Sequence, residues 1–160
     1  MNIAIISAVA KDNLAIGYKN DLCFKLKKDL KHFKELTLGH TIIMGENTFK
    51  SLPNGPLPGR RNIVLTENKD IGCENYATLE EALEACKNED TVFIIGGGML
   101  YRTSLHLANV LYITEIDSIP ENADTFFPEY RDKFTLESSE PEEENGIKFY
   151  FTKYVQVPIL

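Results

Sequence analysis

Short apolar runs rich in β-branched residues recur along the chain, separated by segments with helical periodicity. Five of these runs have the length and continuous apolar character of strands covered on both faces: Ile3–Val9, Thr41–Met44, Asn62–Leu65, Thr91–Ile95 and Val110–Ile116. Two later segments, near Phe134–Ser139 and Ile147–Val155, alternate more and predict an antiparallel hairpin at one edge of the sheet. The late acidic cluster, Glu137–Gly146, is interpreted as a solvated turn between these strands.

Helical segments are predicted between the strands. Leu26–Leu36 repeats apolar residues at helical spacing, Thr78-Leu-Glu-Glu81 is a capping box that opens a helix through Cys86, and Met99–Leu107 follows three glycines. Strands that alternate with helices favour an α/β fold with a mainly parallel central sheet. We therefore predict one three-layer domain over residues 1–160, with the antiparallel hairpin at its C-terminal edge.

Asp29 is the candidate for chemistry in the first predicted helix. At about 100° per residue, it falls inside the apolar stripe, between Phe33 and Leu36. A buried carboxylate is costly unless it is paired or functional. The ordinary alternative is a first-turn Asp that is favoured by the helix dipole and still touches water.

The segment Ile94–Met99 runs from a predicted strand through Gly96, Gly97 and Gly98 into a helix. Glycine lacks a Cβ atom, so the phosphates of a ligand can approach the backbone at the start of the helix. The segment does not match the dinucleotide fingerprint, because Tyr101 stands where the third glycine belongs. A tight turn at the end of a strand is the alternative.

A stiff turn at Pro56–Asn62 carries two adjacent arginines. Its prolines fix the backbone, so that Arg60 or Arg61 can be presented in a set direction to a carboxylate. The ordinary alternative is an exposed pair of arginines after a turn. The three histidines share no ligand spacing, so we predict no metal site.

The 160 residues carry a net charge of −7, which disfavours nucleic acid and anionic membranes as partners. Three cysteines at unrelated spacings form neither a disulfide framework nor a zinc pattern. The apolar run Ile3–Ala10 is too short to span a bilayer, and no basic segment precedes Ala8-Val9-Ala10, which otherwise looks like a signal cleavage site. We expect a cytoplasmic monomer.

The order of the motifs resembles dihydrofolate reductase along essentially the whole chain. Six strings carry the resemblance: Ala15-Ile-Gly17, Leu22-Cys-Phe24 ahead of the Asp29 helix, Ile43–Ser51, Pro56–Asn62, Ile95–Gly98 with Tyr101, and Asp124–Pro128. It implies the fold of that family and binding of dihydrofolate and antifolate-like small molecules.

The resemblance also implies a substrate site. Asp29 would hold N3 and the 2-amino group of the pterin, with Thr114 hydrogen-bonded to it, and Arg60 would pair with the α-carboxylate of the substrate. The backbone carbonyls of Ser7 and Ile95 would face the pterin. The apolar slot and its borders would comprise Ala8, Leu22, Leu30, Phe33, Leu52, Leu57 and Tyr101.

For the cofactor, the resemblance implies three groups of residues. Val9, Ile16 and Gly17 would border the nicotinamide. Leu65, Thr66 and Glu67 would meet the adenosine end. The phosphates would be held by Gly45, Glu46, Asn47 and Thr48 and by Gly96, Gly97, Gly98, Met99, Leu100 and Tyr101.

Several positions depart from the family pattern. Phe24, which we assign a role in catalysis, replaces a Trp whose indole N–H commonly anchors an ordered water near the pterin. Glu46, Glu67 and Met99 stand where the family usually presents basic or hydroxyl side chains to the 2′-phosphate of the cofactor. We expect NADPH as the cofactor, with a weakened preference over NADH.

The resulting hypothesis is an NAD(P)H-dependent reductase of 7,8-dihydrofolate, acting by hydride transfer to pterin C6 and protonation at N5 and supporting one-carbon metabolism. Two alternatives stay open at this point. One is the related reductase of a riboflavin-pathway pyrimidine, and the other is a non-catalytic folate- or nucleotide-binding protein.

Overall fold

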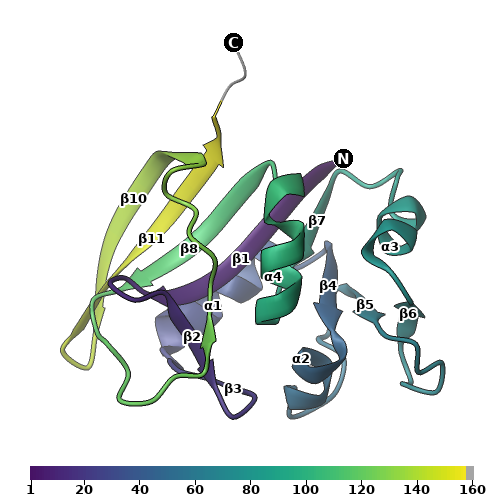
Figure 1. Ribbon diagram of the computed structural model, residues 1–160, viewed down its shortest axis with the longest axis horizontal. Coiled ribbons are helices and arrows are strands. Elements are labelled where there is room, and N and C mark those ends of the chain that lie inside the picture. The colour runs from purple at the N-terminus through teal and green to yellow at the C-terminus, as the bar shows by residue number, and fades with distance from the viewer. Residues whose placement is uncertain (158–160) are drawn as a thin grey trace.

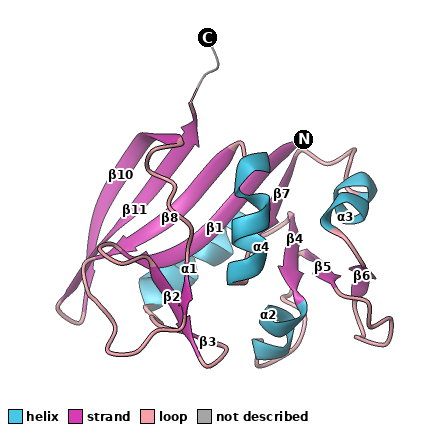
Figure 2. Ribbon diagram, viewed as in Figure 1, coloured by secondary structure: helices cyan, strands magenta, loops and turns pink. Residues whose placement is uncertain are grey.

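The computed structural model describes residues 1–157, so the last three residues of the predicted domain 1–160 lie outside the described residues. Its centre is an eight-stranded sheet in the order β10-β11-β8-β1-β7-β4-β5-β6 (Figures 1 and 2). The strands are β1 (Asn2–Ala10), β4 (Thr41–Gly45), β5 (Arg61–Leu65), β6 (Glu74–Tyr76), β7 (Thr91–Ile94), β8 (Val110–Ile116), β10 (Phe134–Glu144) and β11 (Ile147–Gln156).

The pairing of the strands confirms the predicted sheet. β1 pairs in parallel with β7 and β8, and β4 pairs in parallel with β5 and β7, whereas β11 is antiparallel to both β8 and β10. All five predicted apolar strands are present, and the two alternating segments form the C-terminal edge hairpin. The chain therefore has the mainly parallel α/β architecture that its pattern predicts.

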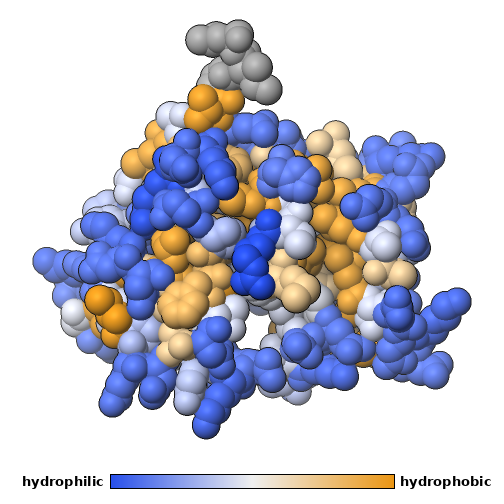
Figure 3. Space-filling model, viewed as in Figure 1, coloured by the Kyte–Doolittle hydropathy of each residue, from blue (hydrophilic) through white to orange (hydrophobic). Residues whose placement is uncertain are grey.

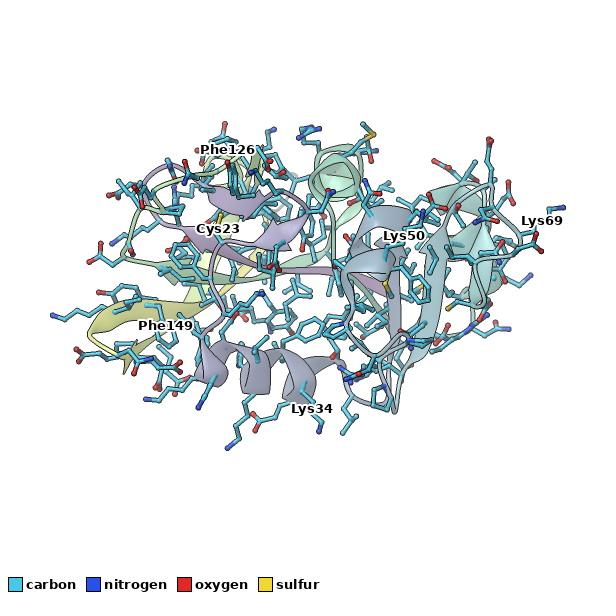
Figure 4. The ribbon with its side chains drawn as sticks, turned by 90° about the horizontal axis from the view of Figure 1, so that it is seen from below. Cys23, Lys34, Lys50, Lys69, Phe126 and Phe149 are labelled. Carbon is cyan, nitrogen blue, oxygen red and sulfur yellow. The ribbon has the colours of Figure 1, made fainter. Side chains whose placement is uncertain are left out.

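Helices cover both faces of the sheet. They are α1 (Lys27–Thr37), α2 (Glu46–Ser51), α3 (Leu79–Ala85) and α4 (Gly98–Ser104), the last followed by a 3₁₀ turn, Leu105–Leu107. Adjacent residues of β4 point to opposite faces: Ile42 packs in the cluster that receives Phe33 of α1, and Ile43 packs with Leu100 of α4. The view from below shows α1 and α4 on opposite sides of the sheet (Figure 4). This arrangement confirms the three layers.

The edge hairpin corrects the interpretation of the acidic cluster. Residues Glu137–Glu144 belong to β10, and the turn consists of Asn145 and Gly146, both with positive φ. Most of β10 is exposed at the edge of the sheet, so acidic side chains can point into water without disturbing the ladder. Charged residues on such an edge also discourage pairing with another chain.

A small second sheet, in the order β3-β2-β9, was not predicted. It consists of β2 (Ala15–Tyr18), β3 (Asp21–Leu22) and β9 (Thr125–Phe126). The N–H of Asp124 donates to the carbonyl of Gly17 at 2.9 Å, which joins two segments more than 100 residues apart. This sheet lies in front of the carboxyl end of β1 (Figure 1).

The helix predicted from the capping box begins as expected. The hydroxyl of Thr78 accepts a hydrogen bond from the N–H of Glu81, and α3 follows directly. The short helix α2 has no counterpart among the predicted elements. None of the helices in the described part of the chain has the length and apolar character needed to cross a bilayer.

Candidate active site

A cavity of about 520 Å³ opens where β4 and β7 end. In open α/β sheets this edge is the usual place for ligands. Space-filling atoms show the same face hollowed along its lower margin, between the small sheet and α2 (Figure 3). The cavity is lined by Ser7, Ile16, Gly17, Asn20, Asp21, Leu22, Gly45, Glu46, Asn47, Thr48, Ser51, Ile95, Gly96, Gly97, Gly98, Met99, Leu100, Tyr101, Arg102, Asp124 and Thr125.

The glycine segment brings β4 and β7 together at the cavity. The N–H of Gly45 donates to the carbonyl of Gly96 at 2.9 Å, and the peptide bond between Gly96 and Gly97 is cis. A Cβ atom on Gly97 would lie 3.3 Å from the Thr48 hydroxyl, and one on Gly98 would lie 2.5 Å from the Thr125 methyl group. Packing on Thr125 thus requires glycine at position 98 and leaves little room at position 97, and the backbone of Gly96–Gly98 lies in the cavity wall.

The side chain of Tyr101 packs against this glycine segment. Its buried hydroxyl donates to the carbonyl of Ile6 at 2.8 Å, and its ring packs on Phe127 at 4.9 Å between centroids. Burial raises the pKa of Tyr101, which keeps the phenol protonated. A Cβ atom on Gly96 would lie 3.2 Å from this hydroxyl, so the Tyr101 side chain packs closely against the backbone of Gly96.

Asp29 lies half-buried in the first turn of α1. The hydroxyl of Thr114, on the central strand β8, donates to its carboxylate at 2.6 Å. Burial raises the pKa of Asp29, while the Thr114 hydrogen bond and the nearby His32 oppose that rise. Glu144 adds to the rise through its negative charge. On balance the pKa of Asp29 lies above the usual value for an aspartate, a perturbation that is common at functional sites.

The edge hairpin fixes the beginning of the helix that carries Asp29. The two carboxylate oxygens of Glu144 accept hydrogen bonds from the N–H groups of Lys27 and Lys28, both at 2.8 Å. These are backbone donors that have no acceptor within the helix. The Nζ atom of Lys28 also reaches Glu142 at 3.1 Å. The start of α1 is therefore tied to the tip of the sheet.

Apolar side chains extend from Asp29 along one side of α1. Phe33, Leu52, Leu57 and Ile95 are half-buried against the cluster around Ile42 and Met44. Leu30 and Leu22 are 47% and 58% exposed. Leu22, Leu30, Phe33, Leu52 and Leu57, predicted for the slot of the substrate rings and its borders, come from β3, α1 and the segment after α2. Ile95, whose carbonyl was predicted to face the pterin, follows the end of β7.

The two arginines in the turn at Pro56–Asn62 have different hydrogen-bond and ion-pair partners. Arg61 donates to Glu74 at 2.6 Å and to Glu89 at 2.8 Å, so its charge is already paired. Arg60 takes part in none of the ion pairs found among residues 1–157, and its Nη1 atom donates to the Thr37 hydroxyl at 3.1 Å. Thr37 is the last residue of α1, so this helix carries Asp29 near one end and holds Arg60 at the other.

Glu46 lines the cavity and is already engaged. It accepts a hydrogen bond from the hydroxyl of Thr66 at 2.7 Å, and Lys50 lies 3.5 Å away on the next turn of α2. The Thr66 hydrogen bond lowers the pKa of Glu46, so the side chain is ionised at neutral pH. Leu65 and Thr66 are half-buried and Glu67 is exposed at the adjacent end of β5.

Thirteen predicted site residues are not among those that line this cavity: Val9, Ala8, Phe24, Asp29, Leu30, Phe33, Leu52, Leu57, Arg60, Leu65, Thr66, Glu67 and Thr114. Val9 is fully buried in the main core, so its side chain cannot border a nicotinamide. Ala8 and Phe24 are partly buried against a smaller cluster formed by Leu26, Ile116 and Phe149. Side-chain direction along β1 explains the displacement of Val9, because alternate residues of a strand face opposite sides.

Six lining residues were not predicted. Asn20 and Asp21 lie between two of the strings that carry the resemblance, and Ser51, Asp124 and Thr125 lie within two others, so an extended match would have included all five. Arg102 follows Met99 by one helical turn, and no local pattern singles it out. The cavity itself brings these residues together: Asn20, Asp21, Ser51, Arg102, Asp124 and Thr125.

Comparisons with known proteins identify the family of the chain. The sequence model of the dihydrofolate reductase family matches residues 2–156. The chain is 39% identical to a dihydrofolate reductase of Neisseria gonorrhoeae, over 97% of this chain and 98% of that one. It is 40% identical to a dihydrofolate reductase of Bacillus subtilis, over 89% and 88%, and 44% identical to a type 3 enzyme of Salmonella typhimurium, over 81% and 80%.

The fold and these relatives together define an α/β oxidoreductase, and its cleft lies at the carboxyl edge of the sheet. The chain belongs to the dihydrofolate reductase family. Members of this family reduce dihydrofolate to tetrahydrofolate, generally with NADPH. The two alternatives left open by the sequence, a riboflavin-pathway reductase and a non-catalytic binding protein, are therefore set aside.

Proposed function

We propose that this chain reduces 7,8-dihydrofolate with NADPH, with hydride arriving at C6 of the pterin and a proton at N5, in support of one-carbon metabolism. The observation that carries the proposal is the layout of α1. A half-buried carboxylate lies near its start, an arginine without a carboxylate partner among the described residues lies at its end, and apolar side chains lie between them. Asp29 and Thr37 are eight residues apart, which is about 12 Å along a helix.

This layout matches the chemistry of the substrate. The pterin presents two parallel N–H donors, at N3 and the 2-amino group, which suit a bidentate carboxylate such as Asp29. The rings of the pterin and of the aminobenzoyl group present flat aromatic faces, and the side chains Phe33, Leu52 and Leu57 suit such surfaces. The glutamate tail ends in carboxylates, for which Arg60 is the complementary cation.

Asp29 has a role in proton transfer by this proposal. When bound, NADPH supplies the hydride, and the chain must supply orientation and a route for the proton. Asp29 holds the pterin in one tautomer and acts on N5 through water, without direct contact. Phe24 has no hydrogen-bond donor, so it leaves a bridging water with one partner fewer than a Trp would provide.

The cavity fits a dinucleotide by its donor set. Its wall combines the backbone of Gly96–Gly98 with neutral donors on Asn47, Thr48 and Thr125, which suit phosphate oxygens. Ile16 and Gly17 of β2 supply the opposite wall for the nicotinamide, and Leu65 with Glu67 borders the adenosine end. Glu46 lies where repulsion of a 2′-phosphate is expected, so we infer a reduced preference for NADPH over NADH.

Thr66 bears on that preference directly. A threonine hydroxyl is a neutral donor that a 2′-phosphate can accept, but in the structure the Thr66 hydroxyl donates to Glu46. Lys50, a compensating cation by its position in sequence, also lies beside Glu46. Both side chains must reorient before they can bind the cofactor.

The net charge of −7 further supports the inference of a monomer that binds neither nucleic acid nor anionic membranes.

The proposed reaction is tested by NADPH oxidation, followed at 340 nm, in the presence and absence of 7,8-dihydrofolate. We expect oxidation that depends on dihydrofolate and yields tetrahydrofolate in a 1:1 ratio with the NADPH consumed. A riboflavin-pathway pyrimidine serves as the control substrate and should produce no oxidation. Tight binding of dihydrofolate with no turnover would contradict the proposal.

A further inference from the structure

The charges around the cavity are unbalanced. Three carboxylates and one guanidinium lie among the described residues that line it, and no lysine or histidine does. Each carboxylate already has a partner, whereas Arg102 forms none of the ion pairs between described side chains. The partners are Lys25 at 2.8 Å from Asp21, Thr66 at 2.7 Å from Glu46, and the N–H of Lys19 at 2.9 Å from Asp124.

Arg102 reaches the glycine wall from within its own helix. The residue lies on α4, one turn after Met99, and long side chains on a helix point back toward its N-terminal end. Its Nη1 atom lies 3.7 Å from the position that a Cβ atom on Gly98 would occupy. The guanidinium is therefore beside the backbone of Gly98, with Thr125 on the same side of the cavity.

A dinucleotide carries two negative charges on its pyrophosphate, and a cavity lined by three carboxylates disfavours them. We propose that Arg102 is the residue that binds the pyrophosphate of the nicotinamide cofactor. This inference rests on the proposed function, because the cofactor is its ligand. Arg102 is the one cationic side chain among the described residues that line the cavity, and it lies on α4 one turn after Met99.

The position of Arg102 also indicates which phosphate group of the cofactor it binds. Glu46 and Thr66, at the end of the cavity expected for the 2′-phosphate, belong to α2 and to the segment after β5. Arg102 belongs to a different element, α4, and lies beside Gly98. It should therefore contribute equally to NADPH and NADH, which share the pyrophosphate and differ only at the 2′ position.

The test is equilibrium titration of Arg102→Gln with NADPH and with NADH, without turnover. A charge-assisted hydrogen bond in a partly exposed site is expected to contribute about tenfold in affinity. Both dissociation constants should rise by this same factor at low salt, and the difference should shrink as salt increases. Arg102→Lys should recover part of the affinity, because it restores the charge without the planar fork.

Lys34→Gln is the matched control. Lys34 lies on the outer side of α1, away from the sheet, and its replacement changes the net charge by the same amount (Figure 4). It should leave both dissociation constants unchanged, and folate affinity should be unchanged in every variant. If Arg102→Gln does not fold, as judged by circular dichroism, Arg102→Lys carries the test and should weaken both dinucleotides equally.

Three results would overturn the inference. Unchanged affinity of the Arg102 variants, with tight wild-type binding, would show that Arg102 does not contact the cofactor while leaving the proposed function intact. A loss confined to NADPH would place Arg102 at the 2′-phosphate. Failure of the wild-type protein to bind either dinucleotide would reject the proposed cofactor, and the inference with it.

Discussion

Replacement of Arg60 by Ala should weaken dihydrofolate in a way that depends on its glutamate tail. Arg60 is half-buried, its Nε atom donates to the carbonyl of Pro58 at 3.0 Å, and its Nη1 atom donates to Thr37 at 3.1 Å. These two bonds hold the guanidinium in place, so little side-chain entropy remains to be lost when a carboxylate binds. Burial lowers the pKa of Arg60, but a guanidinium stays charged at neutral pH.

The size of the effect follows from this setting. A hydrogen bond to a charged group contributes about 1.5–3 kcal/mol, and partial exposure places Arg60 toward the lower end of that range. Each 1.4 kcal/mol is a factor of about ten. The KM for dihydrofolate should therefore rise about 10- to 30-fold in Arg60→Ala, with kcat nearly unchanged, because the tail is bound equally in the ground state and the transition state.

Steady-state kinetics with two substrates separates this role from a structural one. A dihydropterin that lacks the aminobenzoylglutamate should be reduced by wild type and Arg60→Ala with the same kcat/KM. Arg61→Ala is the matched control: it breaks the ion pairs with Glu74 and Glu89, so it should lower the free energy of unfolding and leave KM unchanged. Equal losses on both substrates in Arg60→Ala would refute the assignment of Arg60 to the glutamate tail.

Three further predictions concern the cofactor, the proton and the stability of the fold. In Glu46→Arg, NADPH affinity should rise about 5- to 30-fold at low salt while NADH affinity barely changes, because repulsion of the 2′-phosphate becomes attraction; equal changes for both, by titration, would be inconsistent with this. Phe24→Trp should raise the rate of hydride transfer most at high pH, where protonation limits it, and an unchanged pH–rate profile in a folded variant would reject the role of Phe24. Asp29→Asn should raise the free energy of unfolding at pH 7 by about 1 kcal/mol, because it removes a charge that burial disfavours. The pKa of Asp29 is raised in the folded state, so its stabilising contribution is complete below the unfolded-state pKa of about 3.9 and is lost as pH rises through the folded-state pKa. The gain from Asn, measured by thermal unfolding, should therefore vanish near pH 3.

The helix of Asp29 was predictable because its signal is local. The apolar stripe of α1 repeats at helical spacing, and the structure places Asp29 on that stripe, facing the sheet and Thr114. The strands of the core were predictable for a similar reason, since they are short and continuously apolar. Their order along the chain also sufficed to predict a parallel sheet.

Other elements depend on contacts that no local pattern reveals. The strand β10 carries acidic residues on an exposed edge, so its sequence looks like a turn, and only its ladder with β11 makes it a strand. β3 and β9 are two residues long and exist because β2 pairs with both. In the sequence, Arg102 is an arginine on a predicted helix with no pattern around it. Only the structure shows that it lines the cavity.

The pairing of charges was likewise hidden in the sequence. Arg60 and Arg61 are adjacent, and only the neighbouring Glu74 and Glu89 show that Arg61 is already occupied. Glu46 could be read as an acidic residue free to repel a phosphate, but its bond to Thr66 removes a donor from the same site. Tertiary contacts decide both cases.

The most direct test of the proposed reaction is the single-turnover rate of hydride transfer in Asp29→Asn. The substitution keeps the shape of the side chain and an acceptor for Thr114, but removes the charge and the proton. With NADPH and dihydrofolate saturating at pH 7, and folding verified by circular dichroism, we predict a rate at least about 100-fold below that of the wild-type protein. A folded Asp29→Asn protein that transfers hydride at a rate near that of wild type would contradict the assignment of Asp29 and the mechanism built on it.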